Sequence, residues 1–379
     1  MKVLHLTHTN LDWDYRIQRE MKAVGRLDIV SQVYGLGVVF DEGAVKDDLG
    51  LSYKNLRLVG RRIPKLLFFD ISRQGFTFLE YLVRTFFFII FFRPSVVHAH
   101  DTPALIAARL ARIFINFKFI YDAHELMPHK FGVTRFTSMV IKTAERFSWP
   151  KVDEFITVGS NIKSWYINSY GEKSATVILN SPTPHDRVAK TLPVKFIREK
   201  FDISENAKIY SFVGQFVPGR NIESILETFS RLDSSYHVIF FGFGEKAKII
   251  REAALKHSNI HIHGAVPHSD VVSYLEQCDY GLCLIENVSL SDQLSMPNKL
   301  FEYMQAGLPV LASDLPEIAS TVRDTEIGIL VDISLDDLEI AIKALVKEDR
   351  KINKQKISEY LWPAQECKLQ NLYSRLSKR

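Results

Sequence analysis

Residues 293–317 read QLSMPNKLFEYMQAGLPVLASDLPE, and this stretch decides how the second half of the chain folds. Its pattern predicts a loop, a short helix, a tight turn, a buried strand and a second loop. Ser295 or Asn298 is expected to cap the helix, because either side chain can accept from the free amides of a first turn. Gly307 is expected to end the helix in the left-handed conformation. The apolar run 308–312 then suits a strand buried in a parallel sheet.

Lys299 and Glu302 lie three residues apart at the start of this helix, so they share one helix face. A cation beside free helix amides suits a diphosphate, and a carboxylate suits ribose hydroxyls. The pair therefore indicates a site for a nucleoside diphosphate. The alternative is an ion pair on a solvated helix surface, and spacing alone does not separate the two interpretations.

The same stretch resembles the donor-binding segment of retaining glycosyltransferases of family 4, which have the GT-B fold. The positions that match the family pattern in register are Pro297, Asn298, Lys299, Glu302, Gly307 and Pro309. The resemblance implies that Glu302 binds the ribose of a nucleotide sugar, with Pro297 and Asn298 in the same donor site. It extends over nearly the whole chain and is strongest over residues 209–332.

The chain departs from the family pattern where a second glutamate is usual and Leu294 stands here. A leucine side chain cannot hydrogen-bond a donor sugar. Backbone amides around Ser295 and Met296 are expected to take over that contact. The identity of the sugar therefore does not follow from the resemblance.

A loop at 214–220, GQFVPGR, precedes an expected helix and resembles the family segment that lies near the diphosphate. Gly214 and Gln215 are expected to contact the donor, and Arg220 to grip a phosphate with its guanidinium. Gln215 replaces an arginine that is usual in the family, so Lys299 is expected to carry more of the diphosphate binding. The alternative for Arg220 is a solvated residue at a helix start.

The length and composition of the chain indicate two globular domains. It has 379 residues, 46% hydrophobic and 24% charged. Its three scattered cysteines give neither a disulfide framework nor a metal-binding spacing. The first ten residues lack the long apolar core of a secretory signal. We therefore expect a protein of a reducing compartment, the cytoplasm.

Short apolar runs alternate with helical patterns, which predicts an α/β protein with parallel sheets. With the resemblance, this indicates GT-B architecture, two Rossmann-like domains facing across a cleft. We expect an acceptor-side domain at 1–185, a donor-side domain at 186–361, and a last helix at 362–379 that crosses back to the first domain. Residues 41–75 are expected to be irregular, and Pro363 to break the chain before the last helix. The expected strands are 3–7, 29–34, 96–98, 119–121, 154–158, 177–179, 209–213, 237–241, 260–263, 280–284, 308–312 and 328–331.

Two expected strands of the first domain end in polar runs, HAHD at 98–101 and DAHE at 122–125. Ligands bind at the carboxyl ends of strands in open parallel sheets, and both runs resemble family 4 segments. The resemblance implies that His124 lies close to the transferred sugar; the alternative is a core histidine. The residues expected to line the same site are His100, Asp101 and Glu125. No metal or other cofactor is expected, because the family is metal-independent and the sequence shows no third ligand.

The turn after the first expected strand lacks the glycine pair that is usual in the family. Asp14 and Arg16, followed by Glu20, instead resemble the DxRxxxE run of one branch of it. The resemblance implies that Asp14 and Arg16 line the cleft. The alternative is that they pair with each other or with Glu20 on a solvated helix.

The resemblance implies retaining transfer of a sugar from a nucleotide-diphosphate sugar, UDP-linked rather than GDP-linked, to a glycan or polyprenyl-linked acceptor of cell-envelope polysaccharide synthesis. In the expected route the donor phosphate deprotonates the acceptor hydroxyl, and the catalytic residues are His124, Arg220 and Lys299. Two alternatives are a nucleotide-sugar epimerase of the same fold and a non-catalytic GT-B subunit of another glycosyltransferase. No nucleic-acid partner is expected.

The first half of the chain also suggests contact with an anionic membrane. Residues 1–185 carry an excess of seven basic residues, whereas the remainder carries an excess of three acidic ones. Residues 76–92 are almost wholly apolar, but the uncharged run 85–92 is much shorter than the roughly 20 residues of a spanning helix. A basic and apolar cluster precedes it, formed by Arg61, Arg62, Lys65 and residues 66–69. We expect an interfacial helix, and the alternative is a buried one.

Overall fold

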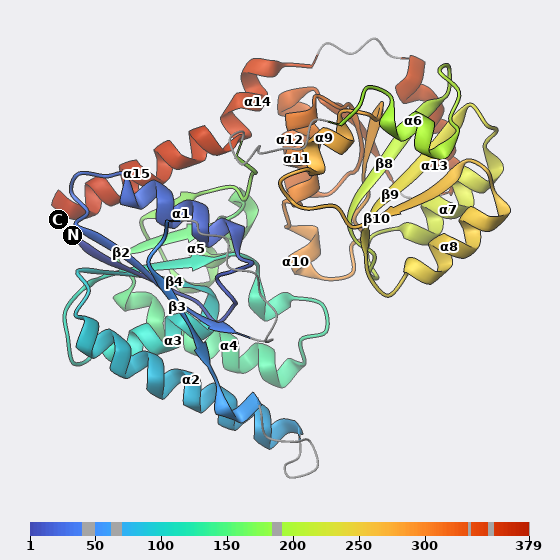
Figure 1. Ribbon diagram of the computed structural model, residues 1–379. Helices are drawn as coiled ribbons and strands as arrows, with labels where there is room; N and C mark the ends of the chain where they lie inside the picture. Colours follow the sequence, from blue (N-terminus) through green and yellow to red (C-terminus); the bar gives the residue numbers. More distant parts are fainter. Residues whose placement is uncertain (40–49, 62–69, 184–191, 333–334, 348–351, 379) are drawn as a thin grey trace. The chain divides into compact units, whose positions relative to one another are not determined.

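The computed structural model describes residues 1–39, 50–61, 70–183, 192–332, 335–347 and 352–378 (Figure 1). The chain forms two compact units: unit 1 comprises Met1–Ile178 and Glu366–Arg379, and unit 2 comprises Leu179–Gln365. Each unit contains a parallel sheet covered by helices, so the predicted class with two Rossmann-like sheets is confirmed. The predicted boundary at 185 and most of the predicted linker lie outside the described residues.

Unit 1 contains, in its described part, a seven-stranded parallel sheet of order β3-β2-β1-β4-β5-β6-β7. Its strands are β1 (Lys2–Leu6), β2 (Gln32–Val39), β3 (Tyr53–Arg57), β4 (Val96–His100), β5 (Lys118–Ala123), β6 (Glu154–Thr157) and β7 (Ala175–Val177). Parallel strands place their carboxyl ends at one edge, so the polar runs after β4 and β5 meet there.

The helices of unit 1 cover both faces of this sheet. They are α1 (Tyr15–Gly25), α2 (Asp70–Phe92), α3 (Asp101–Ala111), α4 (Arg135–Ser148), α5 (Ser160–Tyr170) and, from Glu366 on, α15 (Trp362–Lys378), with short turns η1 (Val59–Arg61), η2 (Met127–His129) and η3 (Trp149–Lys151). Figure 1 shows α1 and α15 on one face, and α2, α3 and α4 packed side by side on the other.

The second strand begins later than expected, and β3 lies in a stretch that we interpreted as irregular. The expected strand ended at residue 34, whereas β2 continues through Gly35 and Gly37 to Val39. A Cβ added to Gly37 would lie 2.5 Å from the Asn55 side chain and 2.7 Å from the Thr9 carbonyl. The absence of a side chain therefore lets β3 and the first loop approach β2 closely.

Helix α2 is longer than expected, because it begins at Asp70 and runs for 23 residues. One face packs inside unit 1, where Tyr81, Thr85 and Ile89 are buried. The opposite face is exposed and apolar, so the alternative of a fully buried helix is wrong. By length and composition alone, the segment Arg73–Phe92 is long and apolar enough to cross a membrane. The uncharged run 85–92 therefore underestimated the apolar length of this helix.

Unit 2 contains, in its described part, a six-stranded parallel sheet of order β10-β9-β8-β11-β12-β13. Its strands are β8 (Lys208–Gln215), β9 (Tyr236–Phe243), β10 (Ile260–Gly264), β11 (Tyr280–Cys283), β12 (Val310–Ser313) and β13 (Gly328–Val331). Its helices are α6 (Phe196–Phe201), α7 (Ile222–Arg231), α8 (Ala247–Lys256), α9 (Val271–Leu275), α10 (Leu290–Gln293), α11 (Asn298–Ala306), α12 (Pro316–Thr325), α13 (Leu335–Lys347) and α14 (Lys354–Tyr360). A buried aromatic and aliphatic core joins β8 and β9 to α7 and α13.

Helix α11 ends as expected but is not capped as expected. Gly307 takes the left-handed conformation at its end, with φ of 72°. The N-cap is Pro297, which has no side-chain donor or acceptor, whereas the Ser295 hydroxyl donates to the Asp292 carbonyl at 2.8 Å. The first-turn amides of α11 are therefore left without a side-chain cap.

The last helix begins at the Trp362–Pro363 pair that we interpreted as a break. Proline in a first turn loses no helical hydrogen bond, because the first amides of a helix have no intrahelical acceptor. From Glu366 on, the helix belongs to unit 1. There Gln370 donates to the Ala23 carbonyl at 3.1 Å, and Arg26 pairs with Glu366 at 2.7 Å.

Candidate active site

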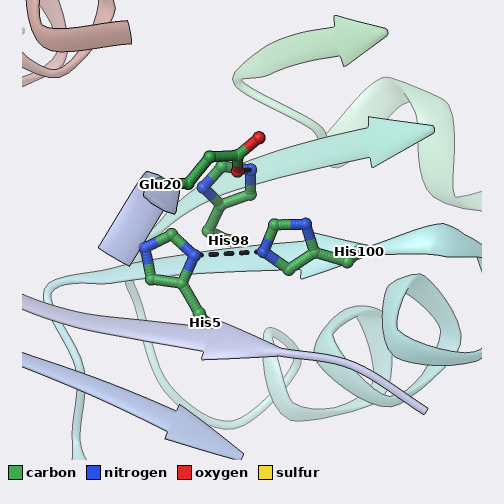
Figure 2. A group of neighbouring side chains, drawn as sticks. All are labelled: His5, Glu20, His98 and His100. Atoms are coloured by element: carbon green, nitrogen blue, oxygen red, sulfur yellow. Dashed lines mark hydrogen bonds and ion pairs between the residues drawn. The ribbon is translucent and has the colours of Figure 1, made fainter. Parts of the chain in front are cut away.

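The carboxyl ends of β4 and β5 bring the predicted polar residues of unit 1 together. In the sheet register His5 lies opposite His98, and His100 lies opposite Asp122. The side chains of His5, Glu20, His98 and His100 point toward one another and are completely buried (Figure 2). A polar cluster of this density is costly to bury, and several of its atoms have no hydrogen-bond partner among the described residues: His5 Nε2, His98 Nε2 and both carboxylate oxygens of Glu20.

A chain of three imidazoles leads from this buried cluster toward the sheet edge. Nδ1 of His5 lies 3.0 Å from Nε2 of His100, and Nδ1 of His100 lies 3.1 Å from Nε2 of His124. Burial lowers the pKa of both His5 and His100 well below the usual value, and neighbouring imidazoles add to the effect. These two rings are therefore neutral at pH 7.

His124, in contrast, favours its protonated, cationic form. Burial opposes its protonation, but the carboxylates of Asp101 and Asp122 raise its pKa to about 9. Its Nε2 lies 3.2 Å from Asp122, and its side chain is 17% exposed. His124 is thus a cation at the partly exposed end of the imidazole chain, rather than an enclosed core histidine.

Asp101 positions the segment that carries His124. Its backbone has φ of 61°, which is uncommon for a residue other than glycine and costs free energy. Its carboxylate accepts from the His124 amide at 3.1 Å. Glu125 instead forms a half-exposed ion pair with Lys130 at 2.8 Å.

Arg16 and Asp14 have partners inside unit 1. Arg16 donates from Nη2 to both carboxylate oxygens of Asp122 at 3.1 Å, and its Nε lies 3.1 Å from Glu20. Asp14 caps α1 by accepting from the Ile17 amide at 3.2 Å. Arg16 therefore pairs with Glu20, as the alternative interpretation had it, but the pair is buried and not solvated.

The residues of Figure 2 are of types that bind metals, and their candidate ligand atoms lie within 4.8 Å of one another. His5 and Glu20 are distant in sequence from the His98–His100 pair, so no third ligand could be recognised from sequence spacing. The guanidinium of Arg16 already supplies a positive charge beside Glu20 and Asp122. A cation there would be repelled by Arg16, so we assign no metal to this cluster.

In unit 2 the buried ammonium of Lys299 is the central feature. The residue is 8% exposed, and its Nζ has no hydrogen-bond partner among the described residues. Nζ lies 3.6 Å from the centre of the Phe212 ring, and burial lowers the pKa of Lys299 to about 8. An unpaired buried cation is costly unless a ligand supplies negative charge.

The loop after β8 lies beside this ammonium. A Cβ added to Gly214 would be 3.8 Å from Cε of Lys299, and the φ of Gly214 is 130°. Gln215 is exposed at the end of the strand. Arg220 donates from Nη1 to the Gly219 carbonyl and, at 3.3 Å, to Oδ1 of Asp292. Asp292 is a partner that we did not expect from the sequence.

Glu302 lies on the same helix as Lys299 and is 7% exposed. Its Oε1 lies 3.7 Å from Nδ1 of His268. Because both Lys299 and Glu302 are buried, the alternative of an ion pair on a solvated surface is wrong. The Ser295 amide is already bonded to the Asp292 carbonyl at 3.1 Å, so it is not free for a sugar.

Comparisons with protein families identify the kind of protein. The model described as glycosyl transferases group 1 matches residues 193–360, and the model described as Glycosyltransferase Family 4 matches residues 38–181. The sucrose-phosphate synthase of Thermosynechococcus elongatus has a similar fold, with TM-score 0.77, 14% identity and full coverage of both chains. HepE of Anabaena, in complex with UDP and glucose, aligns with TM-score 0.71 at 14% identity, also over both whole chains.

The two family matches together span most of the chain and identify it as a glycosyltransferase similar to those of family 4. Its two parallel sheets and its structural neighbours show that it has the GT-B fold.

Two curated relatives match this chain over only part of their own length. Both are chitobiosyldiphosphodolichol beta-mannosyltransferases. The Candida glabrata protein is 24% identical over 46% of this chain, and the Kluyveromyces lactis protein is 22% identical over 60%. The alignments span 44% and 57% of those relatives' own lengths, so this chain matches about half of each.

Proposed function

We propose that this protein transfers a sugar from a nucleoside-diphosphate sugar, with retention of configuration, to a glycan or lipid-linked acceptor. The observation that carries the proposal is the Lys299 ammonium, which is buried and without a hydrogen-bond partner next to the uncapped start of α11. Free helix amides and an unpaired cation together bind a diphosphate. Lys299, Glu302, Pro297 and Asn298 match the family pattern in register.

The roles of the unit 2 residues follow from their chemistry. Lys299, the α11 amides and Arg220 would stabilise the departing diphosphate, on which negative charge grows in the transition state. Arg220 would have to exchange its Asp292 contact for phosphate. Glu302 would accept from the ribose hydroxyls. As its bond to the sugar breaks, the donor phosphate gains negative charge. It would then accept the proton of the acceptor hydroxyl, which attacks on the same face of the sugar.

Unit 1 would supply the acceptor side. A protonated His124 can donate a hydrogen bond to an oxygen of the reacting sugar, and Asp101, Asp122 and His100 hold it in place. The named activity of the two curated relatives concerns a lipid-linked diphosphate glycan, which supports a lipid-linked acceptor. Structures of similar fold hold UDP, which supports a UDP-sugar donor. A role in cell-envelope polysaccharide synthesis at the cytoplasmic side remains part of our proposal.

A panel of nucleotide sugars tests the proposal. Each would be incubated with the full chain, with and without short lipid-diphosphate glycans, and release of nucleoside diphosphate would be measured. Acceptor-dependent release supports a glycosyltransferase, and the anomeric configuration of the product decides retention. Binding of a nucleotide sugar with neither transfer nor epimerisation would instead support the non-catalytic subunit.

Replacing Glu302 with glutamine is expected to weaken UDP binding, because the variant loses charge-assisted hydrogen bonds to ribose. The expected loss of about 1.5 to 3 kcal/mol corresponds to about a 10- to 150-fold rise in Kd, measured by calorimetry. Glu252→Gln, on the exposed surface of α8, is the matched control and should bind UDP as the wild type does. Unchanged affinity in Glu302→Gln would remove Glu302 from the donor site.

We also propose that α2 contacts an anionic membrane. Its outer face exposes a row of large apolar side chains, Phe76, Leu79, Val83, Phe87 and Phe91. An exposed apolar surface of this extent usually marks an interface. The basic cluster that we expected beside it, Arg62 and Lys65 with residues 66–69, lies outside the described residues, as does the side chain of Arg61.

Flotation with liposomes is expected to recover the protein with anionic vesicles at low salt, and less of it as salt rises. Changing Leu79, Phe87 and Phe91 together to serine should abolish recovery, because the inserted apolar area is lost. Leu255→Ser is the control, since Leu255 is 88% exposed on α8 of unit 2. A wild-type protein that stays in the soluble fraction would contradict membrane contact.

A further inference from the structure

Unit 1 contains a cavity of about 900 Å³ that the proposed function has not used. It lies between the η2 turn with its following loop, helix α4 and helix α5. The lining residues are Pro128, His129, Lys130, Val133, Arg135, Ser138, Met139, Lys142, Thr143, Arg146, Trp165, Ser169 and Tyr170. A cavity of this size holds a sugar phosphate or a comparable headgroup.

The lining of this cavity is strongly cationic. It includes four basic side chains and no carboxylate. Lys130 pairs with Glu125, whereas Arg135, Lys142 and Arg146 make no ion pair with any described residue. Three uncompensated cations around one cavity attract a multiply charged anion. Guanidinium groups suit phosphate because they can donate two hydrogen bonds to it at once.

The only carboxylate of helix α4 itself is covered and forms no ion pair with the described cations of the cavity. Glu145 is buried behind Tyr170, whose hydroxyl donates to it at 3.0 Å. The same carboxylate also accepts from Thr102, Tyr121 and Tyr166. Burial raises the pKa of Glu145, and the four hydrogen bonds that it accepts oppose this shift.

Helix α4 carries an apolar row beside the cationic row. Arg135, Lys142 and Arg146 recur at helical spacing and face the cavity, and Phe136, Val140 and Phe147 recur at helical spacing on a neighbouring side of the same helix. Phe136 is 71% exposed, and Met139 and Phe147 are exposed as well. The only residues of α4 that are fully buried are Glu145 and Ser148. The helix therefore presents cations to a cavity and a band of large apolar side chains beside it.

We propose that this cavity binds the phosphate or diphosphate of a lipid-linked acceptor, with the lipid chain against the apolar row of α4. The inference rests on the proposed function, because it names the acceptor's anchoring group. A soluble anion would account for the cations but leave the apolar row unexplained. A lipid chain alone would leave three unpaired cations unexplained. A diphosphate-bearing lipid accounts for both.

Calorimetry on the full chain with farnesyl diphosphate and with inorganic diphosphate tests this inference. Farnesyl diphosphate is expected to bind at least tenfold more tightly than inorganic diphosphate. Changing Lys142 and Arg146 together to glutamine should weaken both ligands at least tenfold. Changing Phe136 and Val140 together to serine should weaken farnesyl diphosphate only. Lys151→Gln, an exposed cation of unit 1 outside the lining, is the control.

UDP binding, measured on the same samples, separates this inference from the proposed function. It should be equal in all these variants, because the proposed nucleotide site lies in unit 2. Equal affinity for both ligands would reduce the cavity to a simple anion site and overturn the inference. Full competition by vesicles of phosphatidylglycerol would assign it to phospholipid headgroups and also overturn it. If the wild-type protein does not bind UDP at all, this would instead count against the proposed function.

Discussion

Replacing Lys299 with methionine is expected to lower kcat by about 10²- to 10³-fold while making unit 2 more stable. The ammonium is buried without a hydrogen-bond partner, so the free protein bears the cost of desolvating it. Methionine fills similar space and removes that cost, which should raise the free energy of unfolding by about 1 to 3 kcal/mol at pH 7. Turnover falls because the departing diphosphate loses its closest cation.

The pH dependence of this stability gain has a definite sign. The pKa of Lys299 is lowered in the folded protein to about 8, from 10.5. Between these values the unfolded chain binds more protons than the folded one, so wild-type stability rises with pH across that window. The advantage of the methionine variant should therefore be full below pH 8 and vanish by about pH 10.5.

Urea unfolding at several pH values and steady-state kinetics measure the two effects. Lys256→Met is the matched control, because Lys256 is exposed in the last turn of α8. It should change neither turnover nor stability. A Lys299→Met protein that is less stable than the wild type, or that keeps full turnover, would show that the ammonium holds the fold rather than a phosphate.

Replacing His124 with alanine is expected to lower kcat by about 10²- to 10⁴-fold, the range for loss of a positioned acid or donor. UDP affinity should not change, because the proposed nucleotide contacts are in unit 2. The wild-type rate should fall as pH rises through about 9, where His124 loses its proton. His257→Ala, at the end of α8, is the control.

Stability provides a second measurement for His124. Its folded pKa of about 9 exceeds the unfolded value of 6.5, so its contribution is complete below pH 6.5 and is lost as pH rises through 9. The alanine variant should lack this dependence. If the variant unfolds at neutral pH, His124→Gln keeps a hydrogen-bonding side chain. A folded glutamine variant with wild-type kcat would rule out a catalytic role.

The local structure around the proposed donor site could be predicted because its determinants are close in sequence. Lys299 and Glu302 are three residues apart on one helix, and Gly307 fixes where that helix ends. The cap could not be predicted. Ser295 and Asn298 both suit an N-cap by type, but Ser295 is occupied by the Asp292 carbonyl one turn earlier, which depends on the short helix α10.

The acceptor half was only partly predictable, because its contacts are non-local. Arg16 meets Asp122 across more than a hundred residues, and His5 meets His100 across a similar separation. Neither pairing leaves a sequence pattern. The strand order brings β1 next to β4, which joins His5 to His100, and β5 next to β4, which places Asp122 within reach of Arg16 on α1. Side-chain charge states, such as that of His124, follow from these contacts and could not be inferred before them.

Helix α15 also has a consequence for how the protein is made. Leu369, Leu372 and Tyr373 are fully buried in unit 1, and the Tyr373 hydroxyl lies 3.0 Å from Nδ1 of His98. Unit 1 therefore needs a segment that the ribosome adds only after all of unit 2 has been synthesised. Until then the nascent chain exposes an apolar surface on its first-made part. That part would be a natural client of chaperones, whereas unit 2 is continuous in sequence and can complete its own packing earlier.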